Sequence, residues 1–232
     1  MIDVFMKWSG EFVSATTLLV YLILVSAMMS IAFGLLGAVA KLSKNRWLAA
    51  AGGAYTGIFR GIPEYLLLLL IYFGSATTLT AVVRHFRPDT GFVDISPFWI
   101  GALAISLVVG AAAAETFRGA FLGVDRGQTE AAHALGLRGG QMFFLVQFPQ
   151  MWRLALPGLG NQMANLVKDT SLISLIGLQE LMYTADMVST STSRPLEVYL
   201  FVAAIYLGLT TFVSLVIASL ERRANRHLVN RA

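Results

Sequence analysis

The sequence predicts an all-α membrane protein that crosses the bilayer five times. Apolar residues make up 56% of its 232 positions and charged residues only 13%, about half the charged share of an ordinary soluble domain. The apolar residues gather in segments at least about as long as the roughly 20 residues that a spanning helix needs. Most basic residues lie in the intervals between those segments.

Five apolar segments qualify as spans and divide the chain in order. The longest polar interval, from about 118 to 153, is too short for a sizeable soluble domain, so we expect residues 1–232 to form a single transmembrane domain. An odd number of spans argues against the two equal inverted halves that many secondary transporters carry. The expected spans cover about residues 12–40, 49–83, 97–117, 154–187 and 197–220.

The basic residues predict the orientation, because cytoplasmic loops carry the excess of Lys and Arg. We expect the N-terminus outside, and the C-terminus and the interval 118–153 in the cytoplasm. The opening MIDVFMKWSGEF lacks the pattern of a cleaved signal peptide, so the first span is expected to remain. The larger, cytoplasmic group is Lys41, Lys44, Arg46, Arg118, Arg126, Arg138, Arg153, Arg222, Arg223, Arg226 and Arg231, and the smaller group is Lys7, Arg84, Arg87 and Arg194.

Several functional classes lack their motifs in this sequence. There is no cysteine, which excludes disulfides and thiolate metal sites, and the three histidines lack metal-ligand spacing. No phosphate-binding loop G-x-x-x-x-G-K-[S/T] and no Ser/His/Asp constellation occurs. We therefore expect no metal site and no ATPase or other enzyme activity in this chain. The positive charge lies beside the spans, so we expect no nucleic-acid partner.

The interval between the third and fourth spans predicts a short polar helix. Asp125 suits its N-cap, Gln128 has the position of a capping-box partner, and Gly136 suits the left-handed residue that ends many helices. About ten residues would form a rod near 15 Å long. Such a helix either lies on lipid headgroups or fits a groove of another protein. Its small alanine side chains bury little area against lipid, which favours the groove.

Pro63 interrupts the second span, because proline removes a backbone hydrogen bond and strains the preceding turn. We expect a kink there, between Arg60 and Glu64. If the helix continues through the kink, these two charges lie four residues apart on one face and pair. Otherwise they line the path of a solute.

The fourth span holds polar and ionisable residues, which are costly in a membrane and usually face inward. Lys168 and Asp169 point about 100° apart, so each is expected to meet another helix, another subunit or a solute. Glu180 is predicted to face an external vestibule. The candidates for lining a path are Arg60, Glu64, Asn161, Lys168, Asp169, Thr170, Ser171 and Glu180.

Two further patterns predict internal packing. Glu115 and Arg118, three residues apart at the end of the third span, are expected to form a structural brace. Small residues recur at 34–37, 49–53 and 110–114, and such residues allow helices to approach closely in lipid. We expect ordinary packing within the chain there and not a dedicated dimerisation seam.

The stretch Glu130-Ala-Ala-His-Ala-Leu-Gly136 resembles the EAA-loop signature of the inner-membrane permease subunits of bacterial ABC importers. The flanking residues are similar to the polar amino-acid branch of that family, and the resemblance covers nearly the whole chain. It also rests on Glu115-Thr-Phe-Arg118-Gly119, Gly127-Gln128, Phe143, Phe144, Pro149-Gln150, Arg153, Leu156-Pro157, Asn161, Lys168-Asp-Thr-Ser-Leu172, Ile176-Gly177 and Glu180.

This resemblance implies the type I ABC importer permease fold, in which the short helix is the coupling helix that docks in a cleft of an ATPase. The implied partners are a second permease subunit (a homologous unlike subunit or a second copy), two ATPase subunits, an external solute-binding protein and the lipid of the inner membrane. ATP and Mg would be bound by the ATPase. The implied coupling residues are Glu130, Ala131, Ala132, Ala134, Leu135 and Gly136.

The expected function is the membrane-spanning subunit of an ATP-driven importer. Arg60-Gly-Ile-Pro-Glu64 with Leu-Ile-Tyr-Phe-Gly74 resembles the histidine, arginine and opine branch, so a basic amino acid or opine is expected. Two alternatives remain open. An ion-gradient-driven transporter would use the Pro63 kink and Asp169 as its coupling site. A non-transporting scaffold subunit would not need the charges at Lys168 and Asp169.

Overall fold

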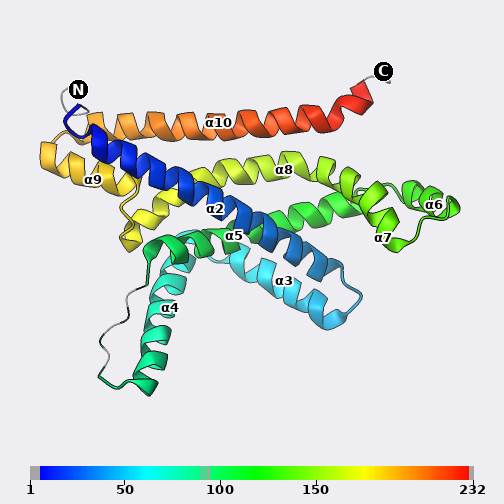
Figure 1. Ribbon diagram of the computed structural model, residues 1–232, viewed down its shortest axis with the longest axis horizontal. Helices are drawn as coiled ribbons and strands as arrows, with labels where there is room; N and C mark the ends of the chain where they lie inside the picture. Colours follow the sequence, from blue (N-terminus) through cyan, green and yellow to red (C-terminus); the bar gives the residue numbers. More distant parts are fainter. Residues whose placement is uncertain (1–5, 90, 92, 94, 230–232) are drawn as a thin grey trace.

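The structure is a computed structural model that describes residues 6–89, 91, 93 and 95–229, with side chains as far as Asn225. These residues form helices and no strand (Figure 1). The helices are α2 (Ser9–Leu42), α3 (Arg46–Gly61), α4 (Glu64–Phe86), α5 (Pro97–Leu122), α6 (Arg126–Ala134), α7 (Gly139–Met142), the π-helix η1 (Phe143–Gln147), α8 (Phe148–Asp169), the 3-10 helix η2 (Thr170–Ile176), α9 (Leu181–Thr192) and α10 (Pro195–Val229).

Local signals in the sequence set several of these boundaries. The side chain of Asn45 caps α3 by accepting a hydrogen bond from the Trp47 N–H at 2.9 Å. Pro97 lies in the first turn of α5, where a missing N–H loses no helical bond. Gly177 ends η2 with φ 89°, a left-handed conformation that residues with a Cβ avoid.

The helix α5 forms the centre of the bundle, and its closest neighbour is α2. In α5, 67% of the most apolar stretch is buried, against 6% in α10. A Cβ added at Gly34 would lie 2.7 Å from the Cβ of Ala113, and one at Gly110 would lie 2.8 Å from the Cβ of Phe33. The small residues thus pack α2 against α5 within the chain, as the sequence predicts.

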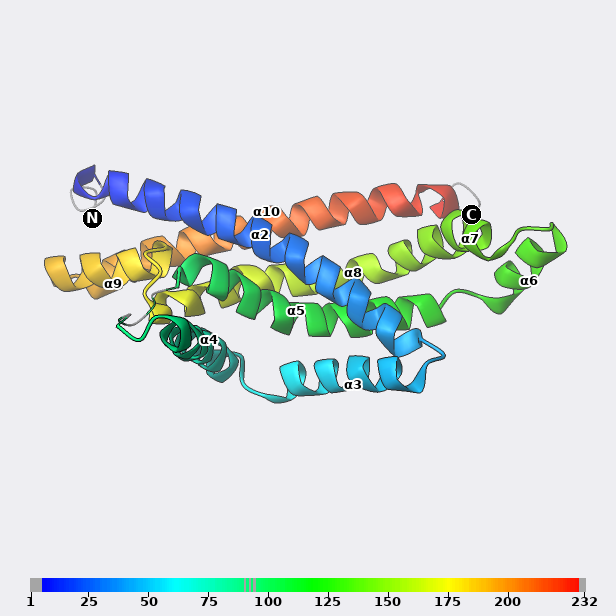
Figure 2. The same cartoon turned by 60° about the horizontal axis from the view of Figure 1, so that its bottom comes forward.

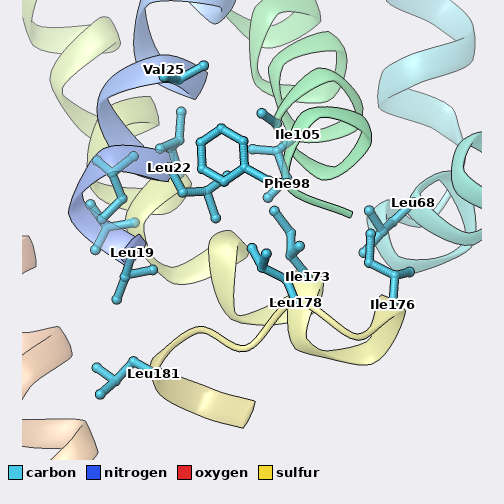
Figure 3. Packing of buried hydrophobic residues seen from close by; sticks show 14 of the residues in the cluster. Leu19, Leu22, Val25, Leu68, Phe98, Ile105, Ile173, Ile176, Leu178 and Leu181 are labelled. Carbon is cyan, nitrogen blue, oxygen red and sulfur yellow. The ribbon is translucent and has the colours of Figure 1, made fainter. Parts of the chain in front are cut away.

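The main core lies where α2, α4 and α5 meet the end of α8 and the segment after it. Figure 3 shows Leu19 and Leu22 of α2 beside Phe98 and Ile105 of α5, with Ile173 of η2 below them. A smaller cluster joins α2, α5 and α8 nearer to α6, through Ala38, Ala113, Phe117, Ala120, Met151, Ala155 and Leu159. Both clusters hold α8 against α5.

Two of the expected spans each contain more than one helix, and in the second the break falls at the predicted kink. The second divides into α3 and α4 at Ile62 and Pro63, and α4 turns away from the other long helices (Figure 1). The fourth divides into α8, η2 and α9 at Gly177 to Glu180. Tertiary packing decides the direction of each following helix, and the hydropathy of a continuous apolar run does not reveal it.

Four helices in the described part of the chain are long and apolar enough to span a membrane: α2, α4, α5 and Pro195–Asn225 of α10. The remaining expected span, the fourth (about 154–187), contains α8, which is more polar and lies between α5 and α10 in the bundle (Figure 2). The count of five is therefore approximate. The interval expected at 118–153 begins after Leu122 and ends before Phe148, because α5 and α8 each continue by several residues.

The start of α2 and the end of α10 lie at opposite ends of the bundle (Figure 2). The helices α6 and α7 lie at the same end as the end of α10. This arrangement fits an odd number of crossings. Of the basic residues in the orientation argument, Arg231 and the side chain of Arg226 lie outside the described residues.

Candidate functional site

The break between α3 and α4 exposes charged side chains in the middle of a predicted span. Ile62 is extended, with φ −102° and ψ 140°, as expected for a residue that precedes proline. Pro63 has no N–H to leave unpaired, and its carbonyl accepts from the Leu67 N–H at 3.0 Å. Arg60 and Glu64 lie on either side of the break and do not form an ion pair among the described residues.

A pocket of about 210 Å³ lies at this break, between α3, α4, α5 and α8. Glu64 and Asp169 line it from different segments, and both also line a smaller cavity beside it. The two carboxylates thus border a common space that includes Arg60. The rest of the lining comes from Phe59, Ile62, Val108, Val109, Ala112, Gln162 and Asn165.

Lys168 and Asp169 line different cavities, although they are adjacent in sequence. Asp169 lines the pocket at the break, whereas Lys168 and Ser171 line a groove of about 350 Å³ with residues of α9 and α10. This separation agrees with their expected divergence on one helix. Of the other candidates, Asn161 is exposed, and Thr170 is buried with its hydroxyl donating to the Val167 carbonyl at 2.6 Å.

Glu180 does not face an external vestibule, which corrects the prediction from sequence. Its side chain is fully buried. It accepts hydrogen bonds from the backbone N–H groups of Met182 at 2.9 Å and Tyr183 at 3.1 Å, and from the Tyr206 hydroxyl at 3.0 Å. Glu180 therefore caps α9 and joins it to α10.

The predicted structural brace is present and is larger than expected. Arg118 Nε lies 3.1 Å from a carboxylate oxygen of Glu115. Lys41, at the end of α2, forms an ion pair with the other oxygen and donates to the Thr56 hydroxyl of α3 at 3.0 Å. The brace thus joins α2, α3 and α5. From the sequence, Lys41 was expected only as a cytoplasmic loop charge.

The helix α6 lies at one end of the bundle, beyond the ends of α5 and α8 (Figure 2). Asp125 caps it by accepting from the Gly127 N–H at 2.6 Å, and Gly136 follows with φ 77°. Gln128 forms no reciprocal capping-box bond among the described residues. The side chains of Glu130, Ala131, Ala134 and Leu135 are exposed together with Gly136, whereas Ala132 is buried within the chain.

Comparison with known proteins now assigns the family. Residues 30–226 match the family described as binding-protein-dependent transport system inner membrane component. The chain belongs to this family. It is a multi-pass permease subunit of the inner membrane, and its family implies an ATPase and a substrate-binding protein as partners.

Several curated permeases are similar over most of their length. The chain is 40% identical to the arginine ABC transporter permease protein ArtQ of Escherichia coli, covering 92% of this chain and 94% of that one. It is 42% identical to the octopine transport system permease protein OccQ of Rhizobium radiobacter, with 89% and 86% covered. It is 37% identical to the histidine/lysine/arginine/ornithine transport system permease protein HisQ of Escherichia coli, with 93% and 94% covered.

Solved structures agree with the type I fold of ABC importer permeases. A crystal structure of an amino acid ABC transporter with histidines superposes with a TM-score of 0.79 at 30% identity, covering 94% of this chain and 96% of that one. An inward-facing structure of the MetNI methionine ABC transporter superposes with a TM-score of 0.71 at 17% identity, covering 94% and 98%, and supports the fold alone.

Gln162 is a polar residue of the permease's pocket that was not predicted from the sequence. Gln162 lines the pocket and donates to the Thr116 hydroxyl at 2.7 Å, which positions its amide between α5 and α8. Gln162, Asn165 and Asp169 are spaced as i, i+3 and i+7, so they share one face of α8. This spacing in the sequence could have predicted a row of polar side chains along one face of α8.

Proposed function

We propose that this permease lines the path of a basic amino acid or opine and couples that path to a separate ATPase. The observation that carries the proposal is the meeting of Glu64 and Asp169 in one pocket at a break between helices. Polar pockets at interrupted helices are typical solute sites in membrane transport proteins. The names of the similar permeases, which refer to arginine, octopine and histidine, support this solute class.

The charges around the pocket favour a cation more clearly than the sequence alone does. Glu115 is paired in the brace, Glu180 caps α9, and Lys168 lines another groove. The charges that remain at the pocket are two carboxylates and one guanidinium. We infer that Glu64 and Asp169 bind the cationic groups of the solute, and that Arg60 binds its carboxylate through paired hydrogen bonds.

The proposed coupling site is α6. Its exposed Glu130 and small side chains fit a groove of an ATPase, while Gly136 sets the angle at which the chain returns to the bundle. The proposed assembly contains two ATPase subunits, an external solute-binding protein and a second permease that is either an unlike homologue or a second copy. ATP and Mg belong to the ATPase, and this chain contributes no catalytic residue.

Uptake of radiolabelled L-arginine by cells that express the importer tests the solute site. We expect Asp169→Asn and Glu64→Gln to weaken uptake at least about tenfold, because a hydrogen bond to a charged group is worth about 1.5–3 kcal/mol. Asp89→Asn, an exposed carboxylate outside the pocket, serves as the control. Unchanged uptake in both pocket variants, at equal membrane levels, would refute the proposed site.

A matched pair of glycine variants tests the coupling site. Gly136→Asp should abolish uptake while the protein remains inserted, because it adds a carboxylate and a Cβ at the left-handed turn (φ 77°) that ends the proposed docking helix. Gly140→Asp also meets open space, but its backbone is not left-handed, so it should retain uptake. Co-purification of the ATPase with tagged protein separates failed docking from failed folding. Full uptake by Gly136→Asp would contradict the assignment.

The proposed orientation has the N-terminus outside and the C-terminus in the cytoplasm. Since the chain has no cysteine, a single cysteine that replaces Lys7 or Arg223 can report on which side of the membrane that residue lies. A membrane-impermeant maleimide applied to intact spheroplasts should label Lys7→Cys only. Labelling of Arg223→Cys alone would show that the chain has the opposite orientation.

A further inference from the structure

An apolar pocket near the α6 end of the bundle has no part in the transport function proposed above. It has a volume of about 340 Å³ and lies between the end of α2, the start of α3, the end of α5 and the start of α8. Every residue that lines it is apolar except Ser43 at the end of α2. Its size falls within the roughly 300–1,000 Å³ of ordinary ligand pockets. It offers almost no hydrogen-bonding group to a polar solute.

Aromatic side chains form the inner wall of this pocket, which we call the aromatic pocket. The rings of Phe121 and Phe143 lie 6.4 Å apart, and those of Phe143 and Phe148 lie 6.0 Å apart. Phe143 begins the π-helix η1, a distortion that is frequent at functional sites. The extra residue in that turn changes the register between Phe143 and α8. The three phenylalanine rings thus pack against one another on one side of the pocket. The cavity of about 340 Å³ lies beside them.

The outer wall of the aromatic pocket faces the surface of the bundle. Val39 is 64% exposed and Leu48 is 46% exposed, and both line the pocket. The helix α2 is long and apolar enough to span a membrane, and Val39 lies near its end. We therefore place this surface at the boundary between the hydrocarbon and the headgroups. An acyl chain that enters from the bilayer thus meets side chains of its own polarity.

Positive charge lies at the polar end of the aromatic pocket. Ser43 lines the pocket, the exposed Lys44 follows it in the connection to α3, and the exposed Arg46 is the first residue of α3. The Trp47 ring, 73% exposed, lies 5.4 Å from the Arg46 guanidinium carbon. Exposed tryptophan beside basic residues is typical of the bilayer interface, and basic sites beside membrane helices bind anionic headgroups.

We propose that the aromatic pocket binds one acyl chain of an anionic phospholipid from the leaflet on the α6 side. The headgroup phosphate contacts Lys44 and Arg46, and the chain lies against Phe121, Phe143 and Val39. Phe121 lies in the last turn of α5, which precedes α6, and Phe143 begins η1, which follows α6 and α7. The bound lipid thus contacts both segments that support α6. This site is independent of the solute pocket.

Native mass spectrometry of the whole complex, purified through a tag on this chain, tests the proposal. The complex is exchanged into mixed micelles that contain equal amounts of phosphatidylglycerol and phosphatidylcholine. We expect one phosphatidylglycerol to remain on each copy of this chain. Val39→Trp should lose that lipid, because an indole fills the outer part of the pocket. Leu36→Trp, at a position 66% exposed on the same helix but outside the pocket, should keep it.

A charge variant tests the headgroup contacts separately. Lys44→Gln with Arg46→Gln should keep a bound lipid but lose the preference for phosphatidylglycerol. Arg222→Gln with Arg223→Gln removes two exposed charges from the same end of the molecule and should preserve the preference. Equal lipid retention by Val39→Trp and Leu36→Trp would overturn the site. An unchanged preference in the Lys44 and Arg46 variant would overturn the headgroup assignment.

A photo-crosslinker identifies the occupant directly. Benzoylphenylalanine in place of Val39 should become linked to phospholipid in native membranes. A crosslink to another protein chain instead would show that the pocket is a protein interface and would refute the lipid proposal. Arginine uptake is not a readout in these experiments, so failure of the solute proposal leaves this test intact.

Discussion

The chain is interrupted twice within its predicted spans, and the two interruptions are built differently. At the first, Ile62 and Pro63 leave Arg60 and Glu64 beside an open pocket. At the second, the buried carboxylate of Glu180 accepts two backbone N–H groups and the Tyr206 hydroxyl. The second break is closed by internal hydrogen bonds, whereas the first keeps its charged groups available.

This difference shows that a charged residue in a span has two possible causes. Backbone groups inside a membrane must be paired within the protein, and Glu180 meets this need for the start of α9. At the first break, Pro63 has no backbone N–H that would need a partner. Glu64 and Arg60 are therefore not needed to satisfy the backbone, and a role toward a solute explains them better. Substitutions at the two breaks should separate stability from transport.

The largest expected effect on stability is at Glu180. Glu180→Ala should lower the free energy of unfolding in detergent by about 3 kcal/mol, because each buried donor left without an acceptor costs about 1–3 kcal/mol. Glu64→Ala, the matched change at the open break, should cost no more than about 0.5 kcal/mol. Denaturant unfolding followed by circular dichroism measures both. Equal losses would remove the distinction between the breaks.

The next effect is at the glycine of the closed break. Gly177→Ala should cost about 1–2 kcal/mol, because φ 89° is a left-handed conformation that strains any residue with a Cβ. Gly61→Ala at the open break meets open space at an ordinary φ and should be neutral or slightly stabilising. The same unfolding measurement applies. A neutral Gly177→Ala would mean that the closed break adapts without strain.

A smaller loss is expected at Tyr206. Tyr206→Phe keeps the ring but removes the hydroxyl that donates to Glu180, so it should cost about 1 kcal/mol. Tyr199→Phe removes a longer, exposed bond of 3.3 Å to Asp186 and should cost less than about 0.5 kcal/mol. Thermal unfolding of the two variants, compared in one detergent, decides the order. A larger loss at Tyr199 would refute the role given to Tyr206.

The smallest stability effect is expected at Pro63. Pro63→Ala should cost about 0.5 kcal/mol, mainly because alanine gives the unfolded chain more freedom. Pro88→Ala, an exposed proline between α4 and α5, is the control and should behave similarly. A cost above about 2 kcal/mol at Pro63 alone, measured by denaturant unfolding, would show that the first break is also a structural element.

Local signals allowed the sequence to predict the features that depend on neighbouring residues. Asp125 and Gly136 define α6 because a cap and a left-handed glycine act within a few residues. The brace of Glu115 and Arg118 follows from their spacing on one helix. The packing role of Gly34 follows from its small size in an apolar helix. In the first two cases the interacting residue is near in sequence. In the third, any closely packed helix can be the neighbour.

Features that depend on a distant partner were missed or wrongly predicted. Lys41 pairs with Glu115, which lies on another helix, so its charge gave no sign of burial. Glu180 caps α9, but glutamate is not a typical N-cap, and its bond to Tyr206 requires α10 to pack nearby. Pro63 predicted a kink, yet the direction of α4 depends on tertiary contacts. The pocket likewise requires the ends of α3 and α8 to meet.

The close contact of Gly34 and Gly110 with their neighbours has a mechanical consequence. Without room for a methyl group where they pack, we expect α2 and α5 to move together as one rigid unit. Val109 of α5 borders the proposed solute pocket, and α5 continues for another 13 residues to Leu122, or about 20 Å at 1.5 Å per residue. A rotation of about 5° around Val109 therefore displaces the end of α5 by roughly 2 Å, at the attachment point of α6.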